Sequence, residues 1–225
     1  MNYFVTGTDT CVGKTLVSCA LLHAFAARGN SVVGMKPVAA GCDDELHEDV
    51  RQLRAASNVQ ASRGQINPYS FVHPVAPHLA ARFIGVRINI ERILDSYAEL
   101  NAQSDVVIVE GAGGFCVPLN DEQDSADLVQ RMNIPVVLVV GMRLGCLNHA
   151  LLTVEAIAAR GLTLAGWVAN VVDADMAMLD ENIATLKQRI AAPLLGIVPH
   201  RAAPDAREVA SLLNLDLLDQ GDLHD

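Results

Sequence analysis

The chain has 225 residues and a formal net charge of −10, and 51% of its residues are hydrophobic while only 4% are aromatic. This length and this composition indicate one α/β domain, because segments rich in Ala, Val and Leu suit a parallel sheet covered by helices. The acidic balance argues against a nucleic-acid-binding surface.

The longest apolar stretch, residues 134–142, is far shorter than the roughly 18 residues that predict a membrane span. No basic-then-apolar leader opens the chain. Its five cysteines are odd in number and scattered without a C-x-x-C pair, which predicts reduced thiols and no metal site built from them. We therefore expect a cytoplasmic protein without a membrane partner.

A glycine-containing turn follows the first apolar run, residues 3–5, and reads T-G-T-D-T-C-V-G-K-T over residues 6–15. A strand, a tight turn and a following helix direct backbone N–H groups and a helix N-terminus at an anion. The pattern predicts a phosphate-binding loop in which Lys14 reaches the terminal phosphates and the Thr15 hydroxyl binds Mg²⁺. Gly7 stands one residue too early for the usual G-x-x-x-x-G-K-[ST] spacing, so the loop is a variant.

A helix is predicted over about 16–27, ending at Arg28-Gly29. The next strand, residues 31–36 (S-V-V-G-M-K), stops at Pro37 and puts Lys36 at a carboxyl end, where parallel sheets bind ligands. Acidic residues 43–49 open a helix that continues to residue 56, as expected for charges that complement a helix dipole.

Residues 57–87 show little periodicity, and within them a short helix over 77–82 starts with proline. This stretch is a candidate substrate-side loop, and a longer helix follows over 88–102.

The segment S-D-V-V-I-V-E, residues 104–110, predicts a buried strand that ends in an acid, and Gly111-Ala112-Gly113-Gly114 follow it. This arrangement resembles a Walker B element: Glu110 is positioned for Mg²⁺ or its water, and the glycines let the backbone approach a phosphate.

The C-terminal half predicts helices over 125–132, about 145–160, 176–190 and 205–213, and strands over 135–140, 164–171 and 193–198. Residues after about 214 are expected to be loosely held. The loop G-M-R-L-G-C-L-N-H, residues 141–149, opens one of these helices, where either an anion such as a carboxylate or an ordinary turn fits equally well.

Alternating strands and helices without an internal repeat predict a parallel sheet of the P-loop NTPase type with right-handed crossovers and helices on both faces. Ligands of such sheets bind at the strand carboxyl ends. Lys14, Lys36, Glu110, residues 145–148 and Asn170 all fall there. The residues alone therefore predict a Mg-nucleotide site with a second basic, small-residue region beside the phosphates.

Eight motifs occur in one order: G-T-D-T-x-V-G-K-T, M-K-P-V-A-A-G, I-N-P-Y, A-P-H-L-A-A, V-E-G-A-G-G, G-C-L-N-H-A-L-L-T, L-A-G-W-V-A-N and A-P-L-L-G-I-V-P. Together they resemble the dethiobiotin synthetases, which close a ureido ring on 7,8-diaminononanoate. The resemblance runs from Tyr3 to about Pro199, whereas residues 42–65 and the tail match poorly.

The resemblance implies a reaction in which one amine of the diamine takes up CO₂ as a carbamate and ATP phosphorylates that carbamate. The second amine then displaces phosphate from the mixed anhydride, which yields dethiobiotin, ADP and phosphate. It implies Lys36, Lys14 and Thr10 as catalytic residues, with Lys14 stabilising the phosphoryl group in transfer and Lys36 holding carbamate oxygens and phosphates. Thr15, Asp49 and Glu110 match the family's magnesium ligands.

The nucleotide site implied by the resemblance comprises Cys11, Val12, Gly13, Lys14, Thr15, Asp49, Glu110, Gly111, Ala112, Gly113, Asn170, Pro199, His200 and Arg201. Asn170 is expected to read the adenine edge. The substrate site comprises Ala40, Gly145, Cys146, Leu147 and Asn148. In the family the 145–148 loop comes from the partner subunit of a homodimer and receives the substrate carboxylate.

Three positions depart from the family pattern. Cys11 stands where many relatives carry Glu, and one charge at about 5 Å is worth on the order of 3 kcal/mol at an effective dielectric of about 20. Ala40 replaces a frequent Ser, and Asn182 replaces a frequent Tyr near the substrate carboxylate. Substrate recognition is therefore expected to differ in detail.

Two other functions compete with this assignment. Dimeric ATPase switches of the partition and division-site type share the loop style, but they usually carry another lysine early in the loop, where this chain has Thr8 and Thr10. They also often carry a membrane- or DNA-binding surface. An amide-forming ligase of corrin synthesis would need a glutaminase domain, for which 225 residues leave little room.

Overall fold

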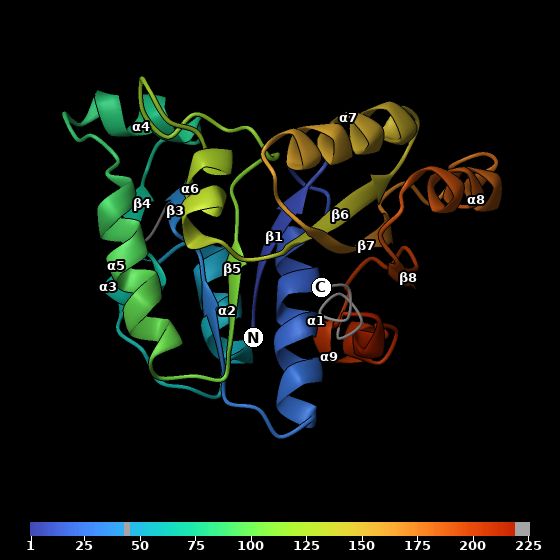
Figure 1. The fold of residues 1–225 in the computed structure, drawn as a ribbon, viewed down its shortest axis with the longest axis horizontal. Coiled ribbons are helices and arrows are strands. Elements are labelled where there is room, and N and C mark those ends of the chain that lie inside the picture. Colours follow the sequence, from blue (N-terminus) through green and yellow to red (C-terminus); the bar gives the residue numbers. More distant parts are fainter. Residues whose placement is uncertain (43–45, 219–225) are drawn as a thin grey trace.

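A six-stranded parallel sheet forms the centre of the molecule, in a computed structural model that describes residues 1–42 and 46–218 (Figure 1). The strands, in spatial order, are β2 (Val32–Met35), β5 (Val106–Glu110), β1 (Asn2–Gly7), β6 (Val136–Met142), β7 (Leu164–Val171) and β8 (Leu194–Val198). The predicted parallel α/β sheet is confirmed.

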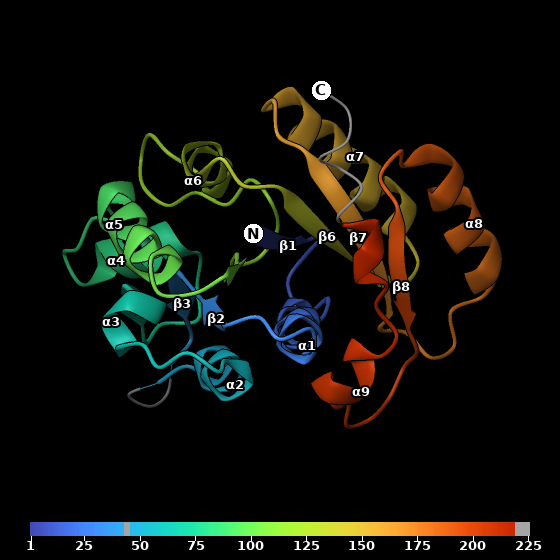
Figure 2. The same ribbon diagram turned by 60° about the horizontal axis from the view of Figure 1, so that its bottom comes forward.

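Helices cover both faces of this sheet, as Figure 2 shows. One face carries α1 (Lys14–Ala27), α2 (Glu48–Ala56) and α9 (Ala206–Ala210). The other carries α5 (Ile90–Asn101), α6 (Ser125–Met132), α7 (Cys146–Ala159) and α8 (Leu179–Arg189). Within residues 1–42 and 46–218, the longest and most apolar helices still fall short of what a membrane crossing requires.

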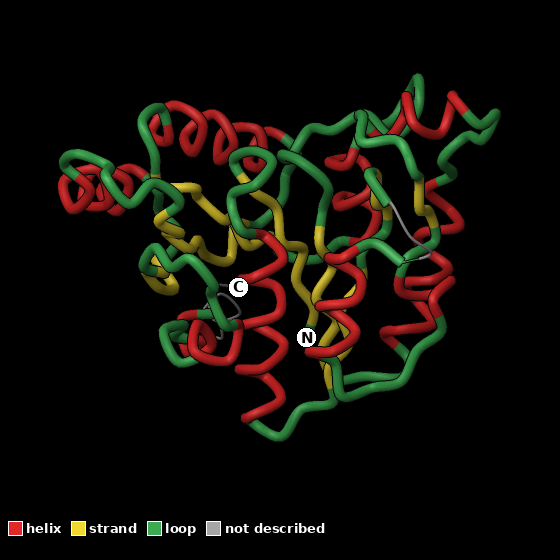
Figure 3. Tube along the Cα trace, turned by 180° about the vertical axis from the view of Figure 1, so that it is seen from behind, coloured by secondary structure: helices red, strands yellow, loops and turns green. Residues whose placement is uncertain are grey.

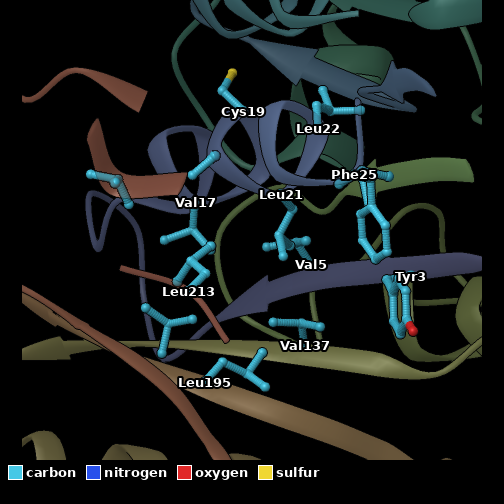
Figure 4. Close-up of a cluster of buried hydrophobic side chains, with 14 of the residues drawn as sticks. Tyr3, Val5, Val17, Cys19, Leu21, Leu22, Phe25, Val137, Leu195 and Leu213 are labelled. Atoms are coloured by element: carbon cyan, nitrogen blue, oxygen red, sulfur yellow. The ribbon is translucent and has the colours of Figure 1, made fainter. Parts of the chain in front are cut away.

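Helix α1 is the most deeply packed element on its face (Figure 4). It follows directly on the phosphate-binding loop, and Leu21 and Leu22 on it are fully buried. The rings of Phe25 on α1 and Tyr3 on β1 stack with their centroids 5.8 Å apart. The helix that begins at the loop is thereby fixed against the central strand that leads into it.

The sequence did not predict a second, two-stranded parallel sheet, formed by β3 (Val38–Ala40) and β4 (Tyr69–Phe71) beside the main one (Figure 3). Helix α3 (Arg63–Ile66) was also missed, whereas α4 (Pro77–Phe83) lies where a short helix was expected. Elements of three or four residues are too short to show a hydrophobic period, which explains the omissions.

Strand β2 lies at one edge of the main sheet, and side chains satisfy its outward N–H groups. The Val32 N–H donates to Asn58 Oδ1 at 2.7 Å, and the Gly34 N–H donates to Ser57 Oγ at 2.9 Å. Side chains that occupy backbone donors in this way protect an edge strand against pairing with another chain.

The C-terminal segment differs from the expectation that residues after about 214 are loosely held. Residues 215–217 form a 3₁₀ turn, and Leu215 and Leu218 are buried in the core around α1. The Asn214 N–H also donates to Leu195 O at 2.8 Å. The expectation is wrong for residues 214–218, because their leucines cover apolar surface left by the short α9. Residues 219–225, like acidic residues 43–45, lie outside the described part.

We predict that Leu22→Ala lowers the free energy of unfolding by about 2–5 kcal/mol, because it opens a cavity in a fully buried position beside the sheet. Urea denaturation followed by circular dichroism measures the loss. Leu152→Ala, at a side chain that is 56% exposed, is the matched control and should stay within about 0.5 kcal/mol of the parent. Similar losses for both variants would contradict the assignment of the core.

Candidate active site

A cavity of about 860 Å³ opens at the carboxyl ends of β1, β2 and β5. Its lining comprises Thr10, Cys11, Gly13, Lys14, Thr15, Lys36, Val38, Ala39, Ala40, His47, Asp49, Pro74, Val75, Ala76, Pro77, Glu110, Ala112, Gly113, Gly114 and Val117. Most residues predicted for phosphate, metal and catalysis therefore meet in one place. The 74–77 segment, within the candidate substrate-side loop, forms another part of the wall.

The phosphate-binding loop folds around its own lysine. Lys14 Nζ donates to Asp9 O at 2.9 Å, and Asp9 Oδ1 accepts the Thr10 N–H at 2.7 Å. Gly13 has a φ of 90°, and a Cβ there would stand 2.1 Å from Asn170 Nδ2. Only glycine fits at that position, which explains the glycine before the lysine in the motif.

Lys36 forms the centre of the polar network in the cavity. Its Nζ lies 2.6 Å from Glu110 Oε1 and 2.9 Å from Asp49 Oδ2. The Thr15 hydroxyl donates to the same Glu110 oxygen at 2.8 Å. Met35, the last residue of β2, pairs with Val109 of β5 in the parallel register. The residues that follow these two are Lys36 and Glu110. The register thus places the ammonium beside the carboxylate.

The carboxylates determine the charge state of Lys36. Burial alone would lower the pKa of its ammonium, but Glu110 and Asp49 outweigh that effect and raise the pKa above its ordinary value. Burial also acts on Asp49, yet Lys36 holds the pKa of that carboxyl below its usual range. Burial and the neighbouring charge of Lys36 lower the pKa of Lys14 to about 8. The two lysines of the site therefore differ in how firmly each holds its proton.

The donor set fits a magnesium ion that also binds a nucleotide. No group of three or more His, Cys, Asp or Glu in the described ranges is arranged to hold a metal by itself. Here two carboxylates and the Thr15 hydroxyl converge, and Glu110 Oε2 is buried without a hydrogen-bond partner. Mg²⁺ is commonly held by one or two carboxylates together with substrate phosphates. Asp49, Glu110 and Thr15 are therefore sufficient when phosphates supply other ligands.

Comparison with known proteins shows which family the chain belongs to. A family model described as "AAA domain" matches residues 1–207. The chain is 58% identical over 214 residues to an ATP-dependent dethiobiotin synthetase of Nitrosospira multiformis, with 95% of each chain covered. It is 57% identical over 217 residues to one from Aromatoleum aromaticum, covering 95% of this chain and 96% of the relative. The chain belongs to the dethiobiotin synthetase family.

Two solved structures show the same fold at low sequence identity. The MinD cell division protein of Aquifex aeolicus is 14% identical with a TM-score of 0.56, covering 98% of this chain and 86% of MinD. The MinD of Pyrococcus horikoshii, solved in complex with Mg-ADP, is 14% identical with a TM-score of 0.55, covering 99% and 97%. These similarities support the P-loop fold and carry no argument about function.

Some residues that the dethiobiotin synthetase family implies lie outside the cavity lining. Asn170 stands behind the phosphate-binding loop, where its Nδ2 donates to Val12 O at 2.8 Å. Residues 145–148 lie at the start of α7, and Pro199–Arg201 follow β8. In the described part of the chain, none of residues 145–148 lines the cavity.

The three residues that depart from the dethiobiotin synthetase pattern lie in different parts of the structure. Cys11 is exposed in the loop with a φ of 58°, and nothing in the structure explains why cysteine occupies it. Ala40 lines the cavity with no polar side-chain group. Asn182 lies in α8, where its Nδ2 donates to Met178 O.

Sequence reasoning missed two polar contacts of the site. His47 caps α2 by accepting the Asp49 N–H at 3.2 Å, and its Nδ1 is 3.6 Å from the Asp49 carboxylate. Arg143 pairs with Asp9 at 2.6 Å and links the phosphate-binding loop to the loop before α7. Histidine is not among the residues that usually cap helices, and no local pattern indicated Arg143, so the sequence offered no clear signal for either contact.

We predict that Lys14→Met stabilises the nucleotide-free protein by up to about 3 kcal/mol at pH 7, because it removes a buried charge whose pKa is lowered. Below pH 8 Lys14 is protonated in both the folded and the unfolded chain, so the penalty is fully present. It shrinks as the pH rises from about 8 to 10.5, where only the unfolded chain still holds the proton.

Denaturation of Lys14→Met and its parent at pH 7 and pH 10 measures this difference. Lys187→Met, at an exposed position of α8, is the control and should change stability little at either pH. A Lys14→Met variant that is less stable than its parent at pH 7 would contradict the lowered pKa.

Proposed function

We propose that this chain, as a single ligase domain over residues 1–225, uses ATP and Mg²⁺ to carboxylate 7,8-diaminononanoate with CO₂ and close its ureido ring. The products are dethiobiotin, ADP and phosphate. The observation that carries the proposal is the convergence of Lys14, Lys36, Asp49 and Glu110 in one cavity, in a chain that belongs to the dethiobiotin synthetase family.

The phosphate-binding loop binds the triphosphate. Backbone N–H groups of residues 11–15 and the N-terminus of α1 face the anion, as in other loops that lead into a helix. Lys14, which in the nucleotide-free site donates to Asp9 O, turns to the terminal phosphate and stabilises the charge that spreads over the phosphoryl oxygens during transfer. Phosphate binding stabilises the charged form of Lys14, because an anion raises the pKa of a neighbouring ammonium.

Lys36 holds the carbamate that forms when an amine of the diamine takes up CO₂. Its ammonium is kept protonated by Glu110 and Asp49, so it is a permanent positive charge for the carbamate oxygens. A carbamate oxygen attacks the γ-phosphorus, ADP leaves, and the second amine then attacks the carbamate carbon and expels phosphate. Lys36 and Lys14 stand on the two sides of this transfer, and Thr10 lines the same wall.

Thr15, Asp49 and Glu110 would hold Mg²⁺. The bound ion would neutralise phosphate charge and orient the β- and γ-phosphates. The buried and unpartnered Glu110 Oε2 supports this assignment. The residues around it keep the donor set rigid: Thr15 follows Lys14 at the start of α1, and Asp49 is fixed in the first turn of α2.

The adenine of ATP and the carboxylate of the diamine are recognised by segments on the β6–β8 side of the sheet. Asn170 Oδ1 accepts from the adenine amino group while its Nδ2 holds the loop, and residues 199–201 flank the base. The helix N-terminus at residues 145–148 receives the substrate carboxylate. Because that loop does not line the cavity of its own chain, a second copy supplies it in a homodimer. Leu144, next to the loop and 96% exposed, supports such an interface.

The remaining properties follow from the same proposal. All substrates are small and polar, and the net charge of −10 disfavours binding to nucleic acid. We place the enzyme in the cytoplasm without a membrane partner.

The test is ADP release measured with and without the diamine and bicarbonate. Ring closure predicts that release depends on both, with dethiobiotin formed in equal amount to ADP. A division-site type of ATPase switch would release ADP regardless of either compound. Release that is indifferent to both would therefore overturn the proposed function in favour of that alternative.

We predict that Lys36→Ala lowers the rate of ring closure by about 100-fold or more, because a positive charge that stabilises the reacting oxygens is lost. Binding of ATP, measured by calorimetry, is retained because Lys14 and the loop backbone remain. Lys187→Ala is the control and should keep the parent rate. A Lys36→Ala variant that turns over normally, after circular dichroism confirms folding, would refute the assignment of Lys36 to the carbamate.

A further inference from the structure

The backbone of Lys36 leaves the main sheet at a point where it needs hydrogen-bond partners from elsewhere. Strand β2 ends at Met35 and lies at the sheet edge. The Lys36 N–H donates to Ile66 O at 2.8 Å. The Lys36 carbonyl accepts from the side chain of Asn67, whose Nδ2 lies 2.7 Å away. Both backbone groups of the lysine are thus held by a segment thirty residues further along the chain.

Asn67 is an unusual residue for its position. It is buried, with 4% of its surface exposed. Its Nδ2 donates a second hydrogen bond to Tyr69 O at 2.9 Å, while its Oδ1 is buried without a partner. Burying an acceptor without a partner opposes folding. What the side chain contributes is therefore its two N–H donors, which bridge Lys36 and the start of β4.

The segment around Asn67 fixes the residues on both sides of Pro37. The Tyr69 N–H donates to Pro37 O at 3.2 Å, and Tyr69 pairs with Val38 in the small sheet. Tyr69 is itself anchored, because its hydroxyl accepts the Asn89 N–H at 3.0 Å. Residues 66–69 therefore form a strap, defined here as the segment that holds residues 36–38 against the main sheet.

A lysine side chain is long and freely rotating, so its ammonium can be placed accurately only if its backbone is fixed. Lys36 Nζ meets Glu110 and Asp49 at 2.6 and 2.9 Å. Those two carboxylates belong to different elements, β5 and α2, so a shift of the Lys36 backbone changes both distances. The strap is the support that keeps the ammonium in reach of both.

We propose that Asn67 is a positioning residue for Lys36: its side-chain amide holds the Lys36 carbonyl and so sets where the ammonium stands in the active site. The expected loss of reaction rate rests on the proposed function, whereas the expected displacement of the Lys36 ammonium rests on the structure alone. Asn67 is buried and is not among the described residues that line the cavity.

The experiment compares Asn67→Ala and the nearly isosteric Asn67→Asp with Ser57→Ala. Ser57 accepts the N–H of Gly34 at the same edge of β2, so its variant loses an edge hydrogen bond two residues before Lys36. For the Asn67 variants we expect kcat for dethiobiotin formation to fall about 10- to 100-fold, as for a displaced reacting group. The KM for MgATP should stay within about twofold, because the phosphate-binding loop is untouched. Ser57→Ala should keep the parent kcat.

A second measurement reports the position of Lys36 without turnover. The chain has three lysines, Lys14, Lys36 and Lys187, so ¹³C labelling of lysine gives three resolvable Cε signals in the NMR spectrum. We expect the Asn67 variants to move the Lys36 signal and leave that of Lys187 in place, whereas Ser57→Ala moves neither. An unmoved Lys36 signal together with an unchanged kcat would overturn the proposal.

The two proposals fail in different ways. If the parent protein makes no dethiobiotin but the Lys36 signal still moves in the Asn67 variants, positioning stands and the proposed function fails. If the parent makes dethiobiotin and the Asn67 variants lose rate to the same degree as Ser57→Ala, general weakening of the edge explains the loss and positioning fails.

If the Asn67 variants do not fold, hydrogen exchange of the parent protein tests the proposal instead. The side-chain amide protons of ¹⁵N-labelled Asn67 should exchange with solvent as slowly as the Lys36 backbone amide, because both are held in buried hydrogen bonds. Exchange at the rate of an exposed asparagine such as Asn101 would overturn the proposal.

Discussion

The architecture of the site depends on one buried carboxylate. Glu110 is 1% exposed at the end of an interior strand, and burying a carboxylate opposes folding strongly unless a cation and hydrogen-bond donors accompany it. Lys36 and the Thr15 hydroxyl supply them. Removing one member of such a buried pair typically costs about 3–5 kcal/mol. The register of β2 against β5 places Lys36 beside Glu110, and the start of α1 places the Thr15 hydroxyl there.

The same arrangement gives the two lysines different properties. Lys36 stands between two carboxylates and holds its proton strongly, whereas the pKa of Lys14 is lowered by burial and by Lys36 itself. In the nucleotide-free site the loop therefore carries a buried positive charge that opposes folding. In the proposed function, the stability that Lys14 removes from the empty protein is recovered when a phosphate binds, which is a general exchange of stability for function.

The sequence predicted the parts of the site that local patterns encode. Gly13, Lys14 and Thr15 follow a strand and open a helix, and Glu110 ends an apolar run before glycines, so spacing alone located them. Other contacts depend on residues that are distant in sequence. Asn67 meets Lys36 across thirty-one positions, and nothing in its neighbourhood indicates a buried amide. The family resemblance supplied Asp49, which the acidic run could not distinguish from ordinary helix-start charges.

Prediction of the fold likewise succeeded for local patterns and failed where distant residues decide the structure. Long, strongly apolar segments such as residues 106–110 and 136–142 were located to within two residues at each end, because buried parallel strands consist of continuous apolar runs. The three-residue strands of the small sheet escaped, since their stability comes from pairing with each other and with the strap. Residues 214–218 (N-L-D-L-L) were misjudged because five residues are too few to show a hydrophobic period, and only the apolar surface that the leucines cover reveals their role.

Those last leucines connect the phosphate-binding loop to the order in which the chain is synthesised. Leu213, Leu215 and Leu218 belong to the same cluster as Val17, Leu21 and Leu22 of α1, although about two hundred residues separate them. Helix α1 leaves the ribosome early and stays incompletely covered until residue 218 has emerged. A nascent chain therefore leaves part of the apolar surface of α1 uncovered until its last described residues have been synthesised, and incompletely buried apolar surface of this kind favours aggregation.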